Sequence, residues 1–211
     1  MATQDKIDFL KQMADGIVQI IATADKSGLG ESRIKEFMDF RTSLNQESDR
    51  GSVLMAAAFI EDKLGCLLES YFIQNDKVSK RLLRGNGPLA TFSSKIDLSF
   101  LLGLIPENIL NDLHLLRKIR NDFAHTASKI TFETPAIKDR TNALSVLSKE
   151  MLRNDTKAHF LRSMTTILTV IDMKMENFER CLIQDNFDPS IFDKSLKIVE
   201  DGLSKYEAQV E

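Results

Sequence analysis

Residues 51–73 read GSVLMAAAFIEDKLGCLLESYFI, and this stretch decides the fold class. Its apolar residues recur at helical spacing and cover much more than one narrow stripe, which is typical of a helix at the centre of a bundle. Glu61 lies within this apolar run. It is either an exposed residue on the rim of the helix or a carboxylate that faces a polar site inside the bundle. Ser48 or Asp49 can cap the first turn.

Helical patterns also fill most of the sequence on either side. The spacing predicts helices at residues 5–24, 31–45, 91–104, 107–125, 139–152 and 155–182, and a last amphipathic helix from about residue 188. Residues 81–90 contain Gly-Asn-Gly-Pro, a strong turn signal, and are predicted to be a connector. Residues 130–133 are β-like but too short and isolated to change the fold class.

We therefore predict an all-α helical bundle that forms a single domain over residues 1–211. Its N-terminal helices would occupy residues 1–47, its bundle core residues 48–139, and its additional C-terminal helices residues 140–211. The composition agrees with this fold class, because 9 Gly and 4 Pro leave little material for the many turns of an all-β protein.

Charge and cysteine content narrow the class of protein. With 28 Lys and Arg against 31 Asp and Glu, the net charge is −3, which argues against a protein that coats nucleic acid generally. Cys66 and Cys181 lie in apolar helical stretches, where two free thiols in a reducing cytosol are expected. No apolar run reaches the ~18 residues of a membrane span, so the expected location is the cytoplasm.

The run RNDFAH, residues 120–125, carries the chemistry at the end of the helix predicted at 107–125. A neutral imidazole such as His125 accepts a proton near pH 7, and a guanidinium such as Arg120 holds phosphate oxygens. Those two roles are the minimum for cutting RNA without a metal, by attack of a ribose 2′-OH on its own phosphate. In the alternative interpretation, Arg120 pairs with a carboxylate and His125 stabilises the helix C-terminus.

The helix around this run has one apolar and one polar face. The polar face holds five residues: His114, Arg117, Lys118, Asn121 and His125. Residues five apart on a straight helix are separated by about 140° around the axis. Arg120 and His125 therefore meet only if the helix ends or distorts between them, or if a second subunit completes the site.

Metals and cofactors are not expected. His114, His125 and His159 have no Cys, Asp or Glu at ligand spacing on the same helix face. Neither cysteine has a basic neighbour that would stabilise a thiolate, so cysteine nucleophiles are not expected either.

Arg120-Asn121-x-x-x-His125 resembles the Arg-(Asn/Asp/His)-x-x-x-His signature of HEPN domains, and its wider context resembles the mannitol operon repressor family. The resemblance covers about residues 49–139. It is carried by Ser48-Asp49-Arg50-Gly51, Glu61, Gly85-x-Gly87-Pro88-Leu89, Lys95, Leu102-Gly103-Leu104-Ile105 and Ile119 to His125.

The resemblance implies a helical bundle that dimerises around the motif helix, and in many HEPN proteins a metal-independent ribonuclease. His125 would then be general base or acid and Arg120 the phosphate clamp, with Asn121 orienting them. Ala127 stands where one HEPN toxin group has Tyr. The repressor relatives are described as transcriptional regulators, yet this sequence shows no helix-turn-helix with a basic recognition helix.

Two functions follow as hypotheses. The first is a HEPN-type endoribonuclease in a toxin, defence or stress-regulatory role, with RNA as substrate and Arg117, Lys118 and Asp122 near the site. Glu61 would approach Arg120 and His125. The second is a non-catalytic regulator that acts through protein–protein interaction. A homodimer, an antitoxin or regulatory protein partner, and no membrane association are expected. A ribonuclease needs Arg120 and His125 converging in an open cleft.

Overall fold

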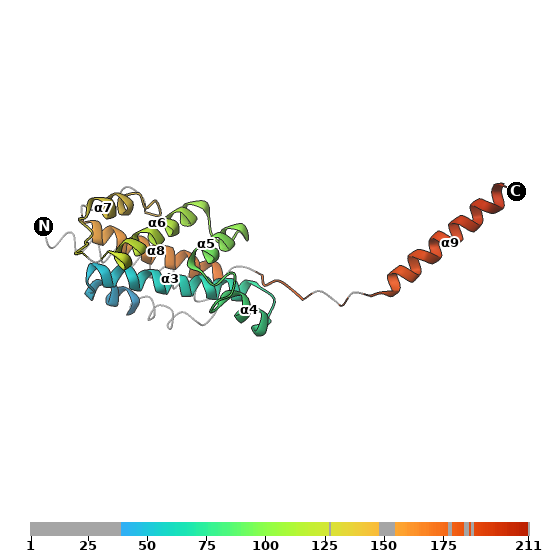
Figure 1. The fold of residues 1–211 in the computed structure, drawn as a ribbon, viewed down its shortest axis with the longest axis horizontal. Coiled ribbons are helices and arrows are strands. Elements are labelled where there is room, and N and C mark those ends of the chain that lie inside the picture. Colours follow the sequence, from blue (N-terminus) through green and yellow to red (C-terminus); the bar gives the residue numbers. More distant parts are fainter. Residues whose placement is uncertain are drawn as a thin grey trace. The chain divides into compact units, whose positions relative to one another are not determined.

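A computed structural model describes residues 39–126, 128–147, 155–176, 179–183, 186 and 188–210 (Figure 1). Within these ranges every regular element is a helix, so the predicted all-α fold is confirmed. The chain forms two compact units, Met1–Cys181 and Leu182–Glu211. The predicted organisation of residues 1–211 as one domain stays a prediction.

Helix α3, Asp49–Tyr71, is central to the first unit and packs against α5, α6 and α8. The side chain of Ser48 caps it by accepting a hydrogen bond from the backbone N of Gly51 at 3.1 Å. Ile60 and Leu64 are fully buried, and burying such a side chain contributes about 1.5–3 kcal/mol. The predicted bounds of this helix, residues 51–73, each lie within two residues of the observed ends.

The next long elements also match their predictions closely. Helix α5, Phe92–Leu101, is capped by Thr91, whose Oγ1 accepts a hydrogen bond from the backbone N of Ser94 at 3.1 Å. Gly103 follows with φ 67°, a left-handed conformation that glycine adopts without steric cost. Helix α6, Glu107–His125, then begins directly after Pro106.

Helix α4, Asp76–Leu83, was missed by the sequence analysis. It is only eight residues long, and part of it was assigned to the predicted connector at residues 81–90. Asn75 caps it by accepting a hydrogen bond from the backbone N of Val78 at 3.1 Å.

For the two following helices, the predicted C-terminal ends and the predicted start of the first were wrong, whereas the start of the second was predicted within one residue. Helix α7 is Pro135–Asn142 and α8 is Thr156–Glu176. The buried carboxylate of Asp112 binds the backbone N atoms of Ser145 and Val146, which holds the chain after α7 out of a helix. After α8, the backbone N of Cys181 donates to the oxygen of Tyr71 at 2.9 Å instead of continuing a helix.

Residues 130–133 form no strand, and residues 132 and 133 lie in a turn, so the prediction that this β-like stretch does not change the fold class is confirmed. Phe132 instead enters the core between Phe123 and Phe160, with ring centroids 5.8 and 5.1 Å apart. Residues 39–46 are helical, in agreement with the helix predicted at 31–45, whereas the helix predicted at 5–24 lies outside the described residues.

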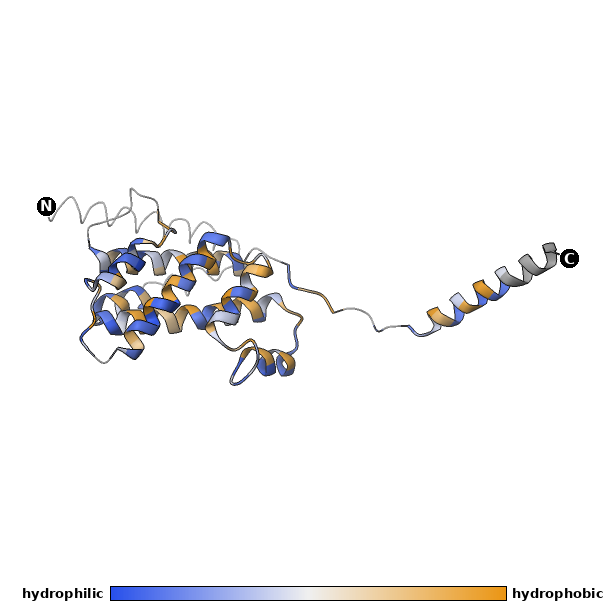
Figure 2. Ribbon diagram, turned by 45° about the horizontal axis from the view of Figure 1, so that its top comes forward, coloured by the Kyte–Doolittle hydropathy of each residue, from blue (hydrophilic) through white to orange (hydrophobic). Residues whose placement is uncertain are grey.

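The second unit contains α9, Ser190–Val210, where a last helix was predicted. Hydrophilic and hydrophobic residues mix along all the described helices rather than separating into long apolar segments (Figure 2). Among the described residues, no helix has both the length and the apolar character needed to cross a bilayer.

Candidate functional site

Helix α6 presents the Arg120–His125 run at its C-terminal end. One side of the helix is anchored in the core by fully buried Leu113, Leu116, Ile119 and Phe123. The helix continues without a break through His125, and the backbone N of Thr126 still donates to the oxygen of Asp122 at 3.1 Å. The motif is therefore part of a regular, well-supported helix.

Arg120 and His125 are both exposed, but they do not share a face of α6. Because the helix is unbroken, the two positions are about 140° apart around its axis. The Nη1 atom of Arg120 donates a hydrogen bond to the Oδ1 atom of half-buried Asn121 at 3.1 Å. Within one chain, the geometry does not assemble an Arg–His pair around a shared phosphate.

The other candidate residues near the motif have separate environments. Asp122 forms an ion pair with Arg140 of α7, which ties the two helices together. Lys118 is exposed. Arg117 is partly buried, and its Nε atom is enclosed without a hydrogen-bond partner among the described residues.

The polar face of α6 is defined here as His114, Arg117, Lys118, Asn121 and His125. Viewed down the helix axis, these five positions fall within an arc of about 100°, on the side opposite the buried stripe. Lys118 and His125 are two turns apart on this face, about 10 Å along the axis. His114 is held by Asp97 of α5, with Nε2 and Oδ1 3.0 Å apart. The polar face of α6 therefore includes His125 but not Arg120.

Glu61 lies elsewhere along the bundle. Its carboxylate pairs with Lys95 of α5 at 3.9 Å, and the same Nζ atom lies 3.5 Å from its backbone oxygen. The start of α3 lies beside the end of α6, since Arg50 contacts Thr126. Glu61 is eleven residues farther along α3, about 16 Å from that point. The structure thus places Glu61 with Lys95.

Sequence reasoning gave Asp49 only as a possible helix cap and Arg50 only as part of the resemblance, and linked neither of them to the loop after His125. The Nη2 atom of Arg50 donates to the backbone oxygen of Thr126 at 2.7 Å, and Asp49 accepts from the backbone N of Phe132 at 3.1 Å. The signal for them in the sequence was their place in Ser48-Asp49-Arg50-Gly51, at the start of the central helix.

The three histidines have different surroundings. His125 is exposed and His114 is half-buried beside Asp97, whereas His159 is buried in α8. Burial lowers the pKa of His159, with Asp112 opposing this shift and Arg162 adding to it. Burial also raises the pKa of the Cys66 thiol, with Asp62 adding to this shift, which disfavours a nucleophilic thiolate.

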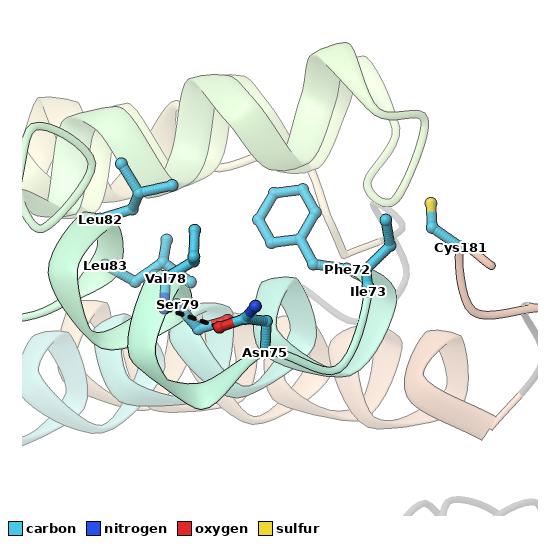
Figure 3. Close-up of a pocket in the computed structure, with 8 residues that line it drawn as sticks. All are labelled: Phe72, Ile73, Asn75, Val78, Ser79, Leu82, Leu83 and Cys181. Carbon is cyan, nitrogen blue, oxygen red and sulfur yellow. Dashed lines mark hydrogen bonds between the residues drawn. The ribbon is translucent and has the colours of Figure 1, made fainter. Parts of the chain in front are cut away.

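An apolar pocket of about 440 Å³ lies between the end of α3, α4 and Cys181 (Figure 3). It is lined by Phe72, Ile73, Asn75, Val78, Ser79, Leu82, Leu83 and Cys181. Asn75 already caps α4, so this polar lining group is occupied. Arg50 and Phe72 are 22 residues apart along α3, about 33 Å, so the pocket is far from the motif.

The comparisons with known proteins concern the first unit. The profile of the mannitol repressor family, MtlR, matches residues 34–183, which is more than half of the chain. A possible transcriptional regulator, YggD from Shigella flexneri 2a, aligns with a TM-score of 0.50 and 18% identity, covering 66% of this chain and 95% of that one.

A second solved structure is the MtlR–HPr complex from Escherichia coli, with a TM-score of 0.48 and 19% identity over 66% of this chain and 96% of that one. No curated protein matches the chain significantly. The likeness to YggD concerns the fold, while the profile match covers the bundle and the α6 motif. The chain therefore belongs to the mannitol repressor (MtlR) family.

Proposed function

We propose that the chain is a non-catalytic regulatory protein that acts by binding a partner protein through the polar face of α6. One observation carries this proposal: α6 is unbroken through His125, so Arg120 and His125 diverge instead of forming a catalytic pair. Membership of the repressor family supports a regulatory role. We further propose that the protein acts in the cytoplasm.

The polar face has the chemistry of a docking surface. Lys118 and His125 are exposed, Arg117 and Asn121 are half-buried, and the opposite side of the helix is fixed in the core. A rigid helix loses little conformational freedom on binding, which favours affinity. Its basic side chains fit a partner surface that carries carboxylates. In the E. coli complex MtlR is bound to HPr, so purified HPr is the first candidate partner.

Isothermal titration calorimetry of the full chain with HPr tests this proposal. Lys118→Glu reverses a charge on the polar face, and at least tenfold weaker binding is expected, about 1.4 kcal/mol. Lys77→Glu is the matched control, because Lys77 is exposed on α4, away from this face. Equal affinities for the wild type and Lys118→Glu, or no binding of HPr at all, would contradict the proposal.

A second candidate is a metal-independent endoribonuclease of the HEPN type in a toxin or defence role. It is favoured by the exposure of both Arg120 and His125, and by the bond of Arg120 to Asn121 rather than to a carboxylate. Such an enzyme requires a homodimer in which Arg120 of one subunit meets His125 of its partner. Glu61, beside Lys95, has no direct part in this version of the site.

A further inference from the structure

The apolar pocket between the end of α3, α4 and Cys181 has the size of a ligand site. Its volume of about 440 Å³ lies within the range of small-molecule sites, roughly 300–1,000 Å³. Most of its lining is hydrocarbon, and none of its lining residues carries a charge. The side-chain oxygen of Asn75 is already engaged in capping α4. The interior of the pocket therefore suits the apolar part of a ligand.

The pocket reaches the surface beside Val78 and Ile73. These two lining residues are 36% and 38% exposed, whereas Leu83, which also lines the pocket, is 2% exposed. In Figure 3 the side chains from α4 lie at one end of the pocket, and Ile73 lies toward the other end, near Cys181. A ligand that fills the interior thus has its outer end beside Val78, on the surface of α4.

Two cations of α4 flank this opening. Arg81 follows Val78 by three residues, so the two positions are about 60° apart around the helix. Lys77 lies one turn before Arg81, about 6 Å along the axis. Both are exposed, and neither forms an ion pair with any residue in the part of the chain that the structure describes. Like charges at this spacing repel each other, and an anion bound between them removes that repulsion.

The other two cations of α4 are placed differently. Arg84 is already paired with Glu69, with Nε and Oε1 2.9 Å apart. Lys80 is about 160° from Val78 around the helix, so it lies away from the opening. The guanidinium of Arg81 offers planar donors that hold a carboxylate or a phosphate through two hydrogen bonds. The opening is thus suited to an anionic head group.

We propose that this pocket binds one small amphiphile with an apolar chain and an anionic head, a carboxylate or a phosphate. The chain fills the pocket, and the head lies at the opening between Arg81 and Lys77. The pocket volume is near the lower end of the range for ligand sites, which fits a single short chain better than the two chains of a membrane lipid. This site is separate from the polar face of α6 and independent of any partner bound there.

Isothermal titration calorimetry of the full chain with dissolved decanoate tests the site. One molecule should bind per chain. Arg81→Glu should weaken binding at least about tenfold, because it removes a charged hydrogen-bond donor and adds a repulsive charge. Lys80→Glu makes the same change in net charge away from the opening, and this matched control should keep the affinity within about twofold. Decanol has the same chain without the charge, so it should bind wild type and Arg81→Glu equally.

The thiol of Cys181 reports whether the ligand lies in the pocket, because Cys181 belongs to the lining. In a Cys66→Ser chain, Cys181 is the single thiol. Saturating decanoate should slow the reaction of this thiol with a disulfide reagent. Circular dichroism shows whether each variant keeps the helical content of the wild type.

Three results would overturn the proposal. The first is no binding of decanoate to the wild-type chain, and the second is binding that leaves the reactivity of Cys181 unchanged. The third is equal loss of affinity in Arg81→Glu and Lys80→Glu, which would show general attraction to a positive surface. Binding of the chain to phosphatidylglycerol vesicles without binding of dissolved decanoate would assign the surface to a membrane instead and would also overturn it.

Discussion

The guanidinium of Arg50, at the start of α3, donates a hydrogen bond to the backbone oxygen of Thr126, 76 positions later and directly after α6. The last carbonyl groups of a helix have no partners within it, so this contact caps α6 at its end. It also holds the chain that follows His125 against the central helix. Since both proposed functions use His125, the geometry of either site depends on Arg50.

Replacing Arg50 should loosen the end of α6 without unfolding the bundle. We expect Arg50→Ala to lower the free energy of unfolding by about 1 kcal/mol, because the contact is only partly buried. Hydrogen exchange should accelerate in residues 128–134 and stay unchanged in α5. Arg84→Ala, which breaks an exposed pair with Glu69, is the control and should cost less. Equal exchange in both variants would argue against a capping role.

Asp112 is a second long-range anchor. It is 1% exposed, and its carboxylate accepts hydrogen bonds from Ser145 N, Ser145 Oγ and Val146 N at 2.8–3.1 Å. Asp112→Asn keeps the shape but turns an amide donor toward these donors. We expect a loss of about 2–3 kcal/mol in chemical denaturation. Asp97→Asn, on the exposed side of α5, should change stability by less than about 1 kcal/mol.

The buried imidazole of His159 should make stability depend on pH. Burial lowers its pKa below the ordinary value near 6.5. Below that value the unfolded chain binds a proton that the folded chain does not. The free energy of unfolding therefore decreases as the pH decreases. The contribution is complete above pH 6.5 and is lost as pH falls toward the folded pKa. The neighbouring charged groups are Asp112, which opposes the shift, and Arg162, which adds to it.

His159→Gln removes the titrating group from this position. The slope of unfolding free energy against pH between 6.5 and 5 should become shallower than in the wild type. His125→Gln is the control, because it changes an exposed histidine at a helix end. A wild-type slope retained in His159→Gln would assign the pH dependence to other groups.

The long helices were predictable because local periodicity encodes them. Residues 51–73 and 107–125 each bury a continuous side, and the structure places α3 and α6 within two residues of those bounds. The ends of α7 and α8 were not predictable, since contacts over long sequence distances set them. Asp112 binds Ser145 across 33 positions, and Tyr71 binds the backbone of Cys181.

For the candidate site too, the local motif was predictable and its surroundings were not. A local motif located the Arg120–His125 run at the end of a helix, which the structure confirms. The surroundings of this run were not encoded locally. Glu61 pairs with Lys95, and the roles of Asp49 and Arg50 depend on a loop some 80 positions away. Such pairings become visible only when the helices are packed.

Ribonuclease assays separate the two proposed functions. The regulatory proposal predicts that wild-type protein leaves single-stranded RNA intact with EDTA present, because Arg120 and His125 diverge within each chain. A composite enzyme would cut it. His125→Ala and Arg120→Lys would then each lose at least about 100-fold in rate, since each removes a proton-transfer group or a bidentate clamp. Lys77→Ala should keep the wild-type rate in that case.

Mixing the two inactive variants then decides whether the site is shared between subunits. A dimer of one His125→Ala chain and one Arg120→Lys chain keeps one intact site only if Arg120 and His125 come from different chains. Half of the dimers in an equal mixture are of this kind, so about a quarter of the wild-type activity should return. No recovery would place both groups in one chain, where the unbroken α6 keeps them apart, and would contradict a composite site.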